Sequence, residues 1–246
     1  MANDMRRKTP VKEKVVAVAL KVMEETLIRV GNEQYLQKYK SYGLTTLKKK
    51  HVSVGADTVE FCFRGKKRVH QEIRLRDARL AAKLKEIEQL AGPFFFQYIN
   101  ESGERHRLHA RDINGYLQRH AEMPLSAKDY RTWYAGVWTF RLLAKCPKYD
   151  DEKSCKSNVL RVLDAVSERL GNTRSVCKQY YVPDNLISAY EDGSLTSHLL
   201  NYQRCNRRQT TRQAEIWLLE FFKQHLIQKK QASSKLLPAK RAFQEI

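Results

Sequence analysis

The sequence predicts a mostly helical domain with one small antiparallel β-sheet near its start, an α+β fold. Three observations predict it. Apolar residues recur with a helical period over residues 11–30. Three short β-prone runs separated by turn residues then lie between residues 51 and 75, and helical stripes return from residue 77 onward.

The first helix is expected from about Val11 to Val30, with a stripe that includes Val15, Val18 and Val22. Gly31-Asn32 is expected to close it, because glycine readily takes the left-handed conformation that ends a helix. The ten residues before it, MANDMRRKTP, are expected to form a disordered basic lead.

The strands are expected in the runs His51–Val54, Thr58–Phe63 and Arg68–Leu75, with turns at 55–57 and 65–67. Asp77 is expected to open the next helix. An extended segment at 93–98 and a turn at 100–103 follow. Further helices are expected near 110–120, 126–145 and 157–170, in shorter pieces after 184, and near 210–230. The result is a single domain over 11–230 and a basic, partly disordered tail over 231–246.

The composition favours a nucleic-acid partner. Lys and Arg total 46 against 27 Asp and Glu, a net charge of +19, and the isoelectric point is ≈ 9.8. Such an excess suits a polyanion. An anionic membrane is the competing partner, but the sequence has no apolar run of spanning length, no signal peptide and no strongly polarised basic helix. Its 12 tyrosines and 3 tryptophans also exceed what a basic packing protein needs.

The cysteine and histidine patterns indicate neither disulfides nor metal. Five cysteines, without a CxxC pair, are typical of a reducing intracellular compartment. The seven histidines form no HExxH and no paired Cys/His spacing, so no metal site is indicated. No GxxxxGK[ST] loop is present, which argues against an ATP-driven motor. We therefore expect no cofactor and no nucleotide, and chemistry carried by side chains alone.

The segment LGNTRSVCKQYY, residues 170–181, is the most informative in the chain. It places a turn, a basic patch and two tyrosines directly after a helix. A tyrosine hydroxyl has a pKa near 10 and is a poor nucleophile at neutral pH. It can attack a phosphodiester where cations lower its pKa and neutralise charge on phosphorus.

Three other segments extend this pattern: LIRVGNEQY at 27–35 followed by YGLTTL at 42–47, FRGK at 63–66, and AKDYRTW at 127–133. In this order, and with Asn172 nine residues before Tyr181, they resemble the catalytic domain of type IB DNA topoisomerases of the bacterial and poxvirus-like kind. The resemblance runs from about residue 11 to about residue 195. It implies the fold that these enzymes share with tyrosine recombinases.

The resemblance also implies roles for five residues. Tyr181, two residues before Pro183, would be the nucleophile, and Arg29 and Arg131 would clamp the scissile phosphate. Lys66, at the tip of a β-hairpin, would protonate the leaving 5′ oxygen. Asn172 stands where many members have histidine; its amide can donate a hydrogen bond to the phosphate but carries no charge.

The residue types suit this chemistry. In-line attack builds negative charge on the nonbridging oxygens, which a cationic clamp must meet. A guanidinium is always charged and binds phosphate through two parallel hydrogen bonds, so arginine suits the clamp better than lysine. A lysine whose pKa is lowered by neighbouring cations can act as the acid.

Each residue taken alone also has a purely structural interpretation. Arg29 could complement a helix dipole, Lys66 could be a solvated turn residue, and Arg131 could form a surface ion pair with Asp129. Asn172 could serve turn geometry, and Tyr181 could be a packed aromatic with Tyr180 as a rival nucleophile.

DNA contacts are expected from two tyrosines and four lysines, although core packing or a solvated face would explain each of them as well. They are Tyr35, Tyr42, Lys48, Lys67, Lys128 and Lys178.

The predicted function is an ATP- and metal-independent topoisomerase that nicks one strand of duplex DNA through a 3′-phosphotyrosyl bond and relaxes supercoils. One alternative is a tyrosine recombinase, which typically has histidine where this chain has Lys128. The other is a basic DNA-binding protein without catalytic activity.

We expect a monomer in the cytoplasm or nucleoid, or in a nucleus or virion if the source is not bacterial. Members of this family also carry a β-rich N-terminal clamp domain. Because the helix expected to open the catalytic domain begins by residue 11, we expect the clamp domain to be absent from this chain.

Overall fold

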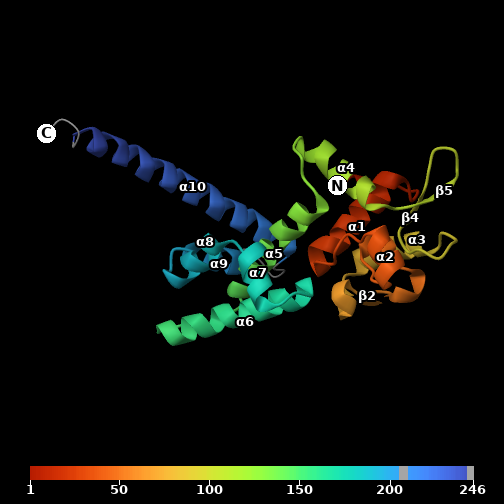
Figure 1. Cartoon of the computed structure of the whole chain (residues 1–246), viewed down its shortest axis with the longest axis horizontal. Helices are drawn as coiled ribbons and strands as arrows, with labels where there is room; N and C mark the ends of the chain where they lie inside the picture. The colour runs from red at the N-terminus through yellow and green to blue at the C-terminus, as the bar shows by residue number, and fades with distance from the viewer. Residues whose placement is uncertain (205–209, 243–246) are drawn as a thin grey trace. The chain divides into compact units, whose positions relative to one another are not determined.

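The computed structural model describes residues 1–204 and 210–242, with side chains described up to residue 227 (Figure 1). Two compact units form the chain. Unit 1 comprises Met1–Ala135 and Leu163–Tyr181, and unit 2 comprises Gly136–Val162 and Val182–Ile246. The sequence pattern instead predicts one domain over 11–230. The mostly helical fold with small antiparallel sheets is confirmed.

Unit 1 is built around α1, Lys12–Thr26, whose side chains are nearly all buried. It contacts α3 (Ala78–Glu88), α4 (Ala110–Ala121) and the strands β3 (His70–Arg76) and β4 (Gln97–Ile99). The helix ends four residues earlier than predicted. Leu27 takes a left-handed conformation, and the next carbonyls leave the helix to accept hydrogen bonds from Leu44 and Thr45. The expectation that Gly31-Asn32 ends α1 is therefore wrong, and Asn32 instead caps α2, Glu33–Tyr39.

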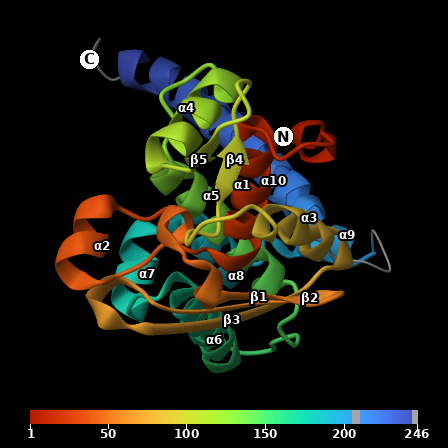
Figure 2. The same cartoon turned by 90° about the vertical axis from the view of Figure 1, so that its right-hand side faces the viewer.

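The predicted sheet forms in the order β1-β2-β3, and Figure 2 shows its three strands side by side. The strands are β1 (Val52–Val54), β2 (Thr58–Arg64) and β3 (His70–Arg76), all antiparallel. Phe61 and Phe63 of β2 are buried, whereas the alternating residues Glu60, Cys62 and Arg64 face solvent. This alternation fixes the register, because a shift by one residue would expose both phenylalanines.

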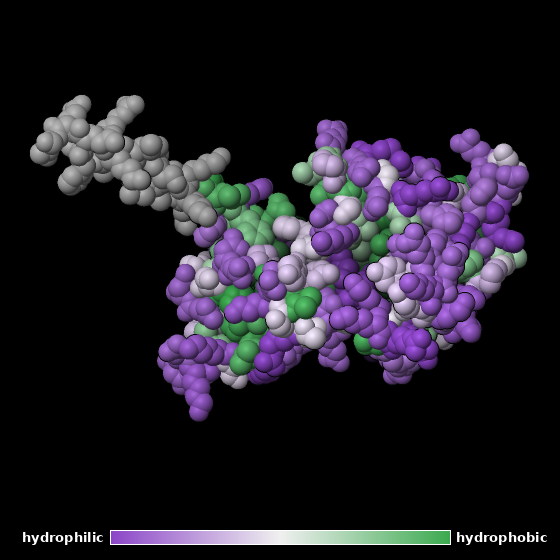
Figure 3. Space-filling model, viewed as in Figure 1, coloured by the Kyte–Doolittle hydropathy of each residue, from purple (hydrophilic) through white to green (hydrophobic). Residues whose placement is uncertain are grey.

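The remaining elements of unit 1 complete its core. The short strands β4 (Gln97–Ile99) and β5 (Arg105–Arg107) form a second hairpin. Residues 1–10 differ from the expected disorder: Asp4–Arg6 form a 3₁₀ turn, Met5 packs on the core, and Asp4 accepts a hydrogen bond from Tyr116. On the face drawn in Figure 3, hydrophilic side chains cover most of unit 1.

Two long helices contribute residues to both units: α5, Ala127–Leu143, and α6, Glu152–Leu170. In unit 1, α6 is followed by α7, Arg174–Tyr180, a helix that the sequence analysis did not predict and that Thr173 caps. Unit 2 adds α8 (Asp184–Glu191), α9 (Thr196–Arg204) and α10 (Thr211–Ala242). Because α10 continues to Ala242, the expected tail is helical up to that residue; its last part, 243–246, lies outside the described residues.

Within the described part of the chain, every helix is too short or too polar to cross a lipid bilayer.

Candidate active site

Arg131 is buried on α5 within unit 1, with 4% of its surface exposed, and it uses all three nitrogens of its guanidinium. Nε donates to the carbonyl of Leu27 at 2.5 Å, and Nη2 donates to the carbonyl of Leu170 at 2.6 Å. Nη1 donates to the hydroxyl oxygen of Tyr181 at 3.1 Å. The ends of α1 and α6 thus fix the guanidinium beside the tyrosine hydroxyl.

The local structure around Arg131 excludes the surface ion pair with Asp129. The Asp129 carboxylate accepts hydrogen bonds from the backbone and the hydroxyl of Ser126, at the start of α5. Burial, together with the nearby charge of Arg29, lowers the pKa of Arg131. In the described residues, no carboxylate lies within ion-pair distance of this guanidinium.

Arg29 lies in the extended segment between α1 and α2, rather than at a helix end. Backbone hydrogen bonds from Leu44 and Thr45 hold this segment. It passes so close to Gly43 that a Cβ atom there would lie 2.6 Å from the Arg29 carbonyl. Glycine at 43 therefore permits the approach that places Arg29 in the site.

The Arg29 side chain reaches the turn after α6. Its Nη2 donates to Oδ1 of Asn172 at 2.6 Å and to the carbonyl of Gly171 at 3.2 Å. Burial lowers the pKa of Arg29, while nearby Tyr181 acts in the opposite direction. As for Arg131, the described residues offer it no carboxylate partner.

Asn172 follows Gly171, whose φ of +57° forms the turn. Its Oδ1 accepts from Arg29, whereas its buried Nδ2 has no hydrogen-bond partner in the described part of the chain. Buried polar atoms are normally hydrogen-bonded, so an orphaned amide beside two cations indicates a place for an external acceptor.

The two tyrosines at the end of α7 have different environments. Tyr181 is half-buried, accepts a hydrogen bond from Arg131 and has the Arg131 guanidinium carbon 5.2 Å from its ring centroid. Tyr180 is 62% exposed. Of these two tyrosines, Tyr181 is the one whose hydroxyl accepts a hydrogen bond from a cation in the described part of the chain.

Lys66 occupies the loop between β2 and β3, in the 3₁₀ turn Lys66–Arg68. Its side chain is exposed, and no described residue forms a hydrogen bond or ion pair with it. Lys66 and Arg29 line two hollows of unit 1 together, the larger with a volume of ≈ 220 Å³. Gln71, which the sequence analysis missed, lines the smaller hollow and fills the space beside both Gly65 and Gly171.

The expected DNA-contact residues fall into two groups. Tyr35, 45% exposed, and half-buried Tyr42 line the larger hollow with Arg29 and Lys66. The lysines Lys67, Lys128 and Lys178 are exposed, and Lys48 is half-buried. These four lysines line neither hollow.

The similarity to known proteins covers the part of the chain that carries these site residues. Residues 1–195 match the family model of the eukaryotic DNA topoisomerase I catalytic core. The chain belongs to this family. The resemblance to type IB topoisomerases stated from the sequence is confirmed.

The similar curated proteins are viral. DNA topoisomerase 1B of Acanthamoeba polyphaga mimivirus is 28% identical over 190 residues, covering 74% of this chain and 56% of that protein. DNA topoisomerase I of Monkeypox virus and DNA topoisomerase 1B of Vaccinia virus (strain Copenhagen) are each 25% identical over 183 residues, covering 71% of this chain and 54% of theirs. The chain thus spans about half the length of these relatives.

One solved structure is similar over 78% of this chain and 50% of its own: the XerH site-specific recombinase bound to its difH substrate, in a pre-cleavage complex. The TM-score is 0.44 and the identity 14%.

Proposed function

We propose that this chain is the catalytic part of a type IB DNA topoisomerase. It nicks one strand of duplex DNA by attack of the Tyr181 hydroxyl on a phosphodiester, forms a 3′-phosphotyrosyl bond, and reseals the strand after the duplex has rotated. The observation that supports this most is a pair of neighbouring guanidiniums without a carboxylate partner among the described residues. Arg131 donates to the Tyr181 hydroxyl, and Arg29, which interacts electrostatically with both groups, donates to Asn172. An unpaired buried cation is costly, so such a site favours binding of an anion.

In this proposal each residue has one role. Arg131 and Arg29 neutralise the charge that develops on the nonbridging oxygens. The unpartnered Nδ2 of Asn172 donates a further hydrogen bond to one of them. Lys66, which lines the same hollow as Arg29, gives a proton to the leaving 5′ oxygen.

The reaction is proposed to need neither ATP nor metal. The phosphotyrosyl bond replaces a phosphodiester of similar energy, and resealing returns it, so no external energy is required. Arginines supply the charge that magnesium supplies in kinases. The partner is duplex DNA, bound by a monomer through phosphate contacts that the net charge of +19 favours. The chain would act where that DNA is held, in the cytoplasm or nucleoid, a nucleus or a virion.

Incubation with supercoiled plasmid in EDTA and without ATP tests this proposal. We expect relaxed topoisomers, and an end-labelled duplex should become linked to protein after the reaction is stopped with detergent. Relaxation that requires ATP, or a nick without a covalent protein–DNA adduct, would contradict the mechanism. DNA binding with neither product would support the non-catalytic alternative.

A further inference from the structure

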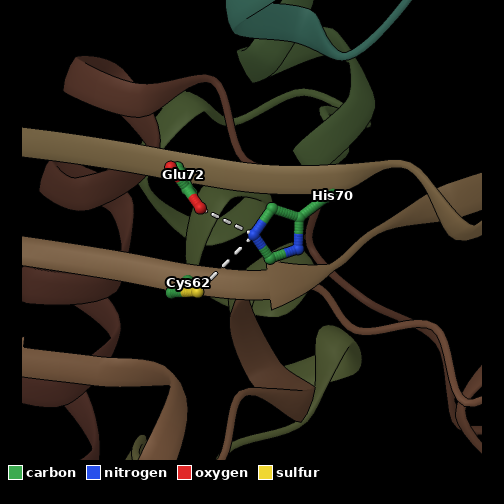
Figure 4. A group of neighbouring side chains, drawn as sticks. All are labelled: Cys62, His70 and Glu72. Carbon is green, nitrogen blue, oxygen red and sulfur yellow. Dashed lines mark hydrogen bonds and ion pairs between the residues drawn. The ribbon is translucent and has the colours of Figure 1, made fainter.

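The solvent face of the β2–β3 hairpin carries three side chains with metal-ligating atoms. Cys62 of β2 lies directly opposite Glu72 of β3, and His70 lies next to Glu72 on the same face. All three are exposed, whereas Phe61 and Phe63 turn to the core. Figure 4 shows the imidazole of His70 between the thiol and the carboxylate.

The distances bring the three donor atoms around one point. His70 Nε2 lies 3.7 Å from Cys62 Sγ and 2.9 Å from Glu72 Oε1, and all three ligand atoms lie within 4.8 Å of one another. Around a tetrahedral zinc ion, bond lengths near 2.0–2.3 Å put a sulfur and a nitrogen ligand about 3.6 Å apart, and a nitrogen and an oxygen ligand about 3.4 Å apart. The sulfur–nitrogen distance already fits, and the carboxylate needs only a small rotation outward.

We propose that Cys62, His70 and Glu72 bind a divalent transition-metal ion of the zinc class. A thiolate and an imidazole select zinc-like ions over magnesium or calcium, which prefer oxygen ligands. The thiolate and carboxylate together supply two negative charges to balance the ion. The exposed position of the cluster leaves the fourth coordination position to water.

The position of the ligands on two different strands explains why the sequence did not reveal the site. Zinc motifs are recognised by short spacings within one segment, such as CxxC. Here the ligands come from two strands, and the antiparallel register alone brings Cys62 next to Glu72. A bound ion would link β2 to β3 close to the last pair of the ladder, Arg64 with His70, before the loop that carries Lys66. The site does not depend on the proposed function.

Cobalt(II) binding tests the site, because a cobalt–thiolate bond gives a charge-transfer absorption band. The full chain would carry Cys146→Ser and Cys205→Ser, which leaves Cys62 besides the buried Cys155 and Cys177. We expect one equivalent of cobalt to produce the band and zinc to remove it. Cys62→Ser should abolish the band. His70→Ala should weaken binding at least about tenfold, since even loss of an outer-shell partner costs that much.

Glu60→Gln is the matched control: Glu60 lies on the same exposed face of β2 and pairs with Arg74, away from the three ligands. It should leave cobalt affinity unchanged. Because every substituted side chain of the hairpin is exposed, the melting temperature without metal should stay near that of the parent. A band that survives Cys62→Ser, an equal loss in Glu60→Gln, or no band at millimolar cobalt would each overturn the proposal.

Discussion

The two sides of the candidate site differ in how their cations are held. On one side, Arg131 and Arg29 are fixed by backbone carbonyls and by Asn172 before any substrate arrives. On the other side, Lys66 stands on an exposed loop, and its side chain forms no hydrogen bond or ion pair with the described residues. Preorganised charge lowers a barrier without reorganisation at the moment of reaction. A proton donor, in contrast, must reach its acceptor only when DNA is bound. In the proposed mechanism, the site thus combines a prebuilt anion clamp with an acid that substrate binding would position.

Tyr181, the proposed nucleophile, contacts Arg131 on the prebuilt side of the site, and removing its hydroxyl should have the largest effect. We expect Tyr181→Phe to show no detectable strand cleavage and nearly unchanged DNA affinity, because only one oxygen is lost. Tyr180→Phe is the matched control and should retain most activity, since its hydroxyl lies outside the arginine cluster. Covalent adducts on denaturing gels measure both. If Tyr180→Phe were the inactive variant, Tyr180 rather than Tyr181 would be the nucleophile.

The clamp itself should have the next largest effect. An arginine that stabilises a phosphoryl-transfer transition state contributes about 10³-fold or more in rate, so Arg131→Ala and Arg29→Ala should each slow single-turnover cleavage by that order. Lysine should restore activity only in part, because it cannot form two parallel hydrogen bonds to phosphate. Arg79→Ala, at an exposed arginine of α3, serves as the control. A near-normal rate in either clamp variant would remove that residue from the site.

For Lys66, on the exposed side of the site, we expect a smaller effect that depends on the leaving group. Lys66→Ala should slow cleavage about 10²-fold, the usual contribution of a general acid. A substrate whose leaving 5′ oxygen is replaced by sulfur should restore the rate, because a thiolate departs without a proton. Lys67→Ala, at the adjacent loop residue that is expected only to contact DNA, should cleave both substrates at the parent's rate once the DNA is saturated with protein. An equal defect of Lys66→Ala on oxygen and sulfur substrates would show that Lys66 acts in another way.

Asn172 should have a smaller effect, because its proposed contribution to the phosphate is one uncharged hydrogen bond, and the carbonyl of Gly171 still accepts from Arg29 when Oδ1 of Asn172 is removed. We expect Asn172→Ala to lose about tenfold in cleavage rate, in line with the cost of about 1.4 kcal/mol for one hydrogen bond. Asn172→His should restore the rate or increase it, since histidine can donate the same bond. Single-turnover rates for the two variants decide this. A fully active alanine variant would mean that the orphaned Nδ2 serves no substrate.

The sequence predicted the family and most of the element order, apart from the short helices α2 and α7, because both depend on local signals. Hydrophobic periodicity located α1 and α6, and turn residues located the hairpin that carries Lys66. It left the environment of Arg131 open, since the carbonyls of Leu27 and Leu170 come from segments far apart in the chain. The early end of α1 was missed for the same reason: tertiary hydrogen bonds to Leu44 and Thr45 compete with the helix. Cross-strand ligands such as Cys62 and Glu72 leave no spacing signal either.

The smallest expected effect concerns stability without DNA. Burial lowers the pKa values of both Arg29 and Arg131 below their ordinary value. A base whose pKa is lower in the folded state destabilises the protein at every pH below that pKa, so the full cost is present at neutral pH. An anion bound between the guanidiniums should therefore stabilise the fold.

Melting curves in sulfate and in chloride at equal ionic strength measure this stabilisation. One kcal/mol of anion binding should raise the melting temperature by about 2–4 °C in a chain of this size. Sulfate also stabilises proteins in general, so the measure is the difference between the parent and Arg29→Ala. Arg79→Ala, which lacks only an exposed arginine, should keep the full shift. Equal sulfate shifts in all three proteins would mean that the two guanidiniums do not form an anion site. The proposal that Arg29 and Arg131 are a prebuilt anion clamp would then be wrong.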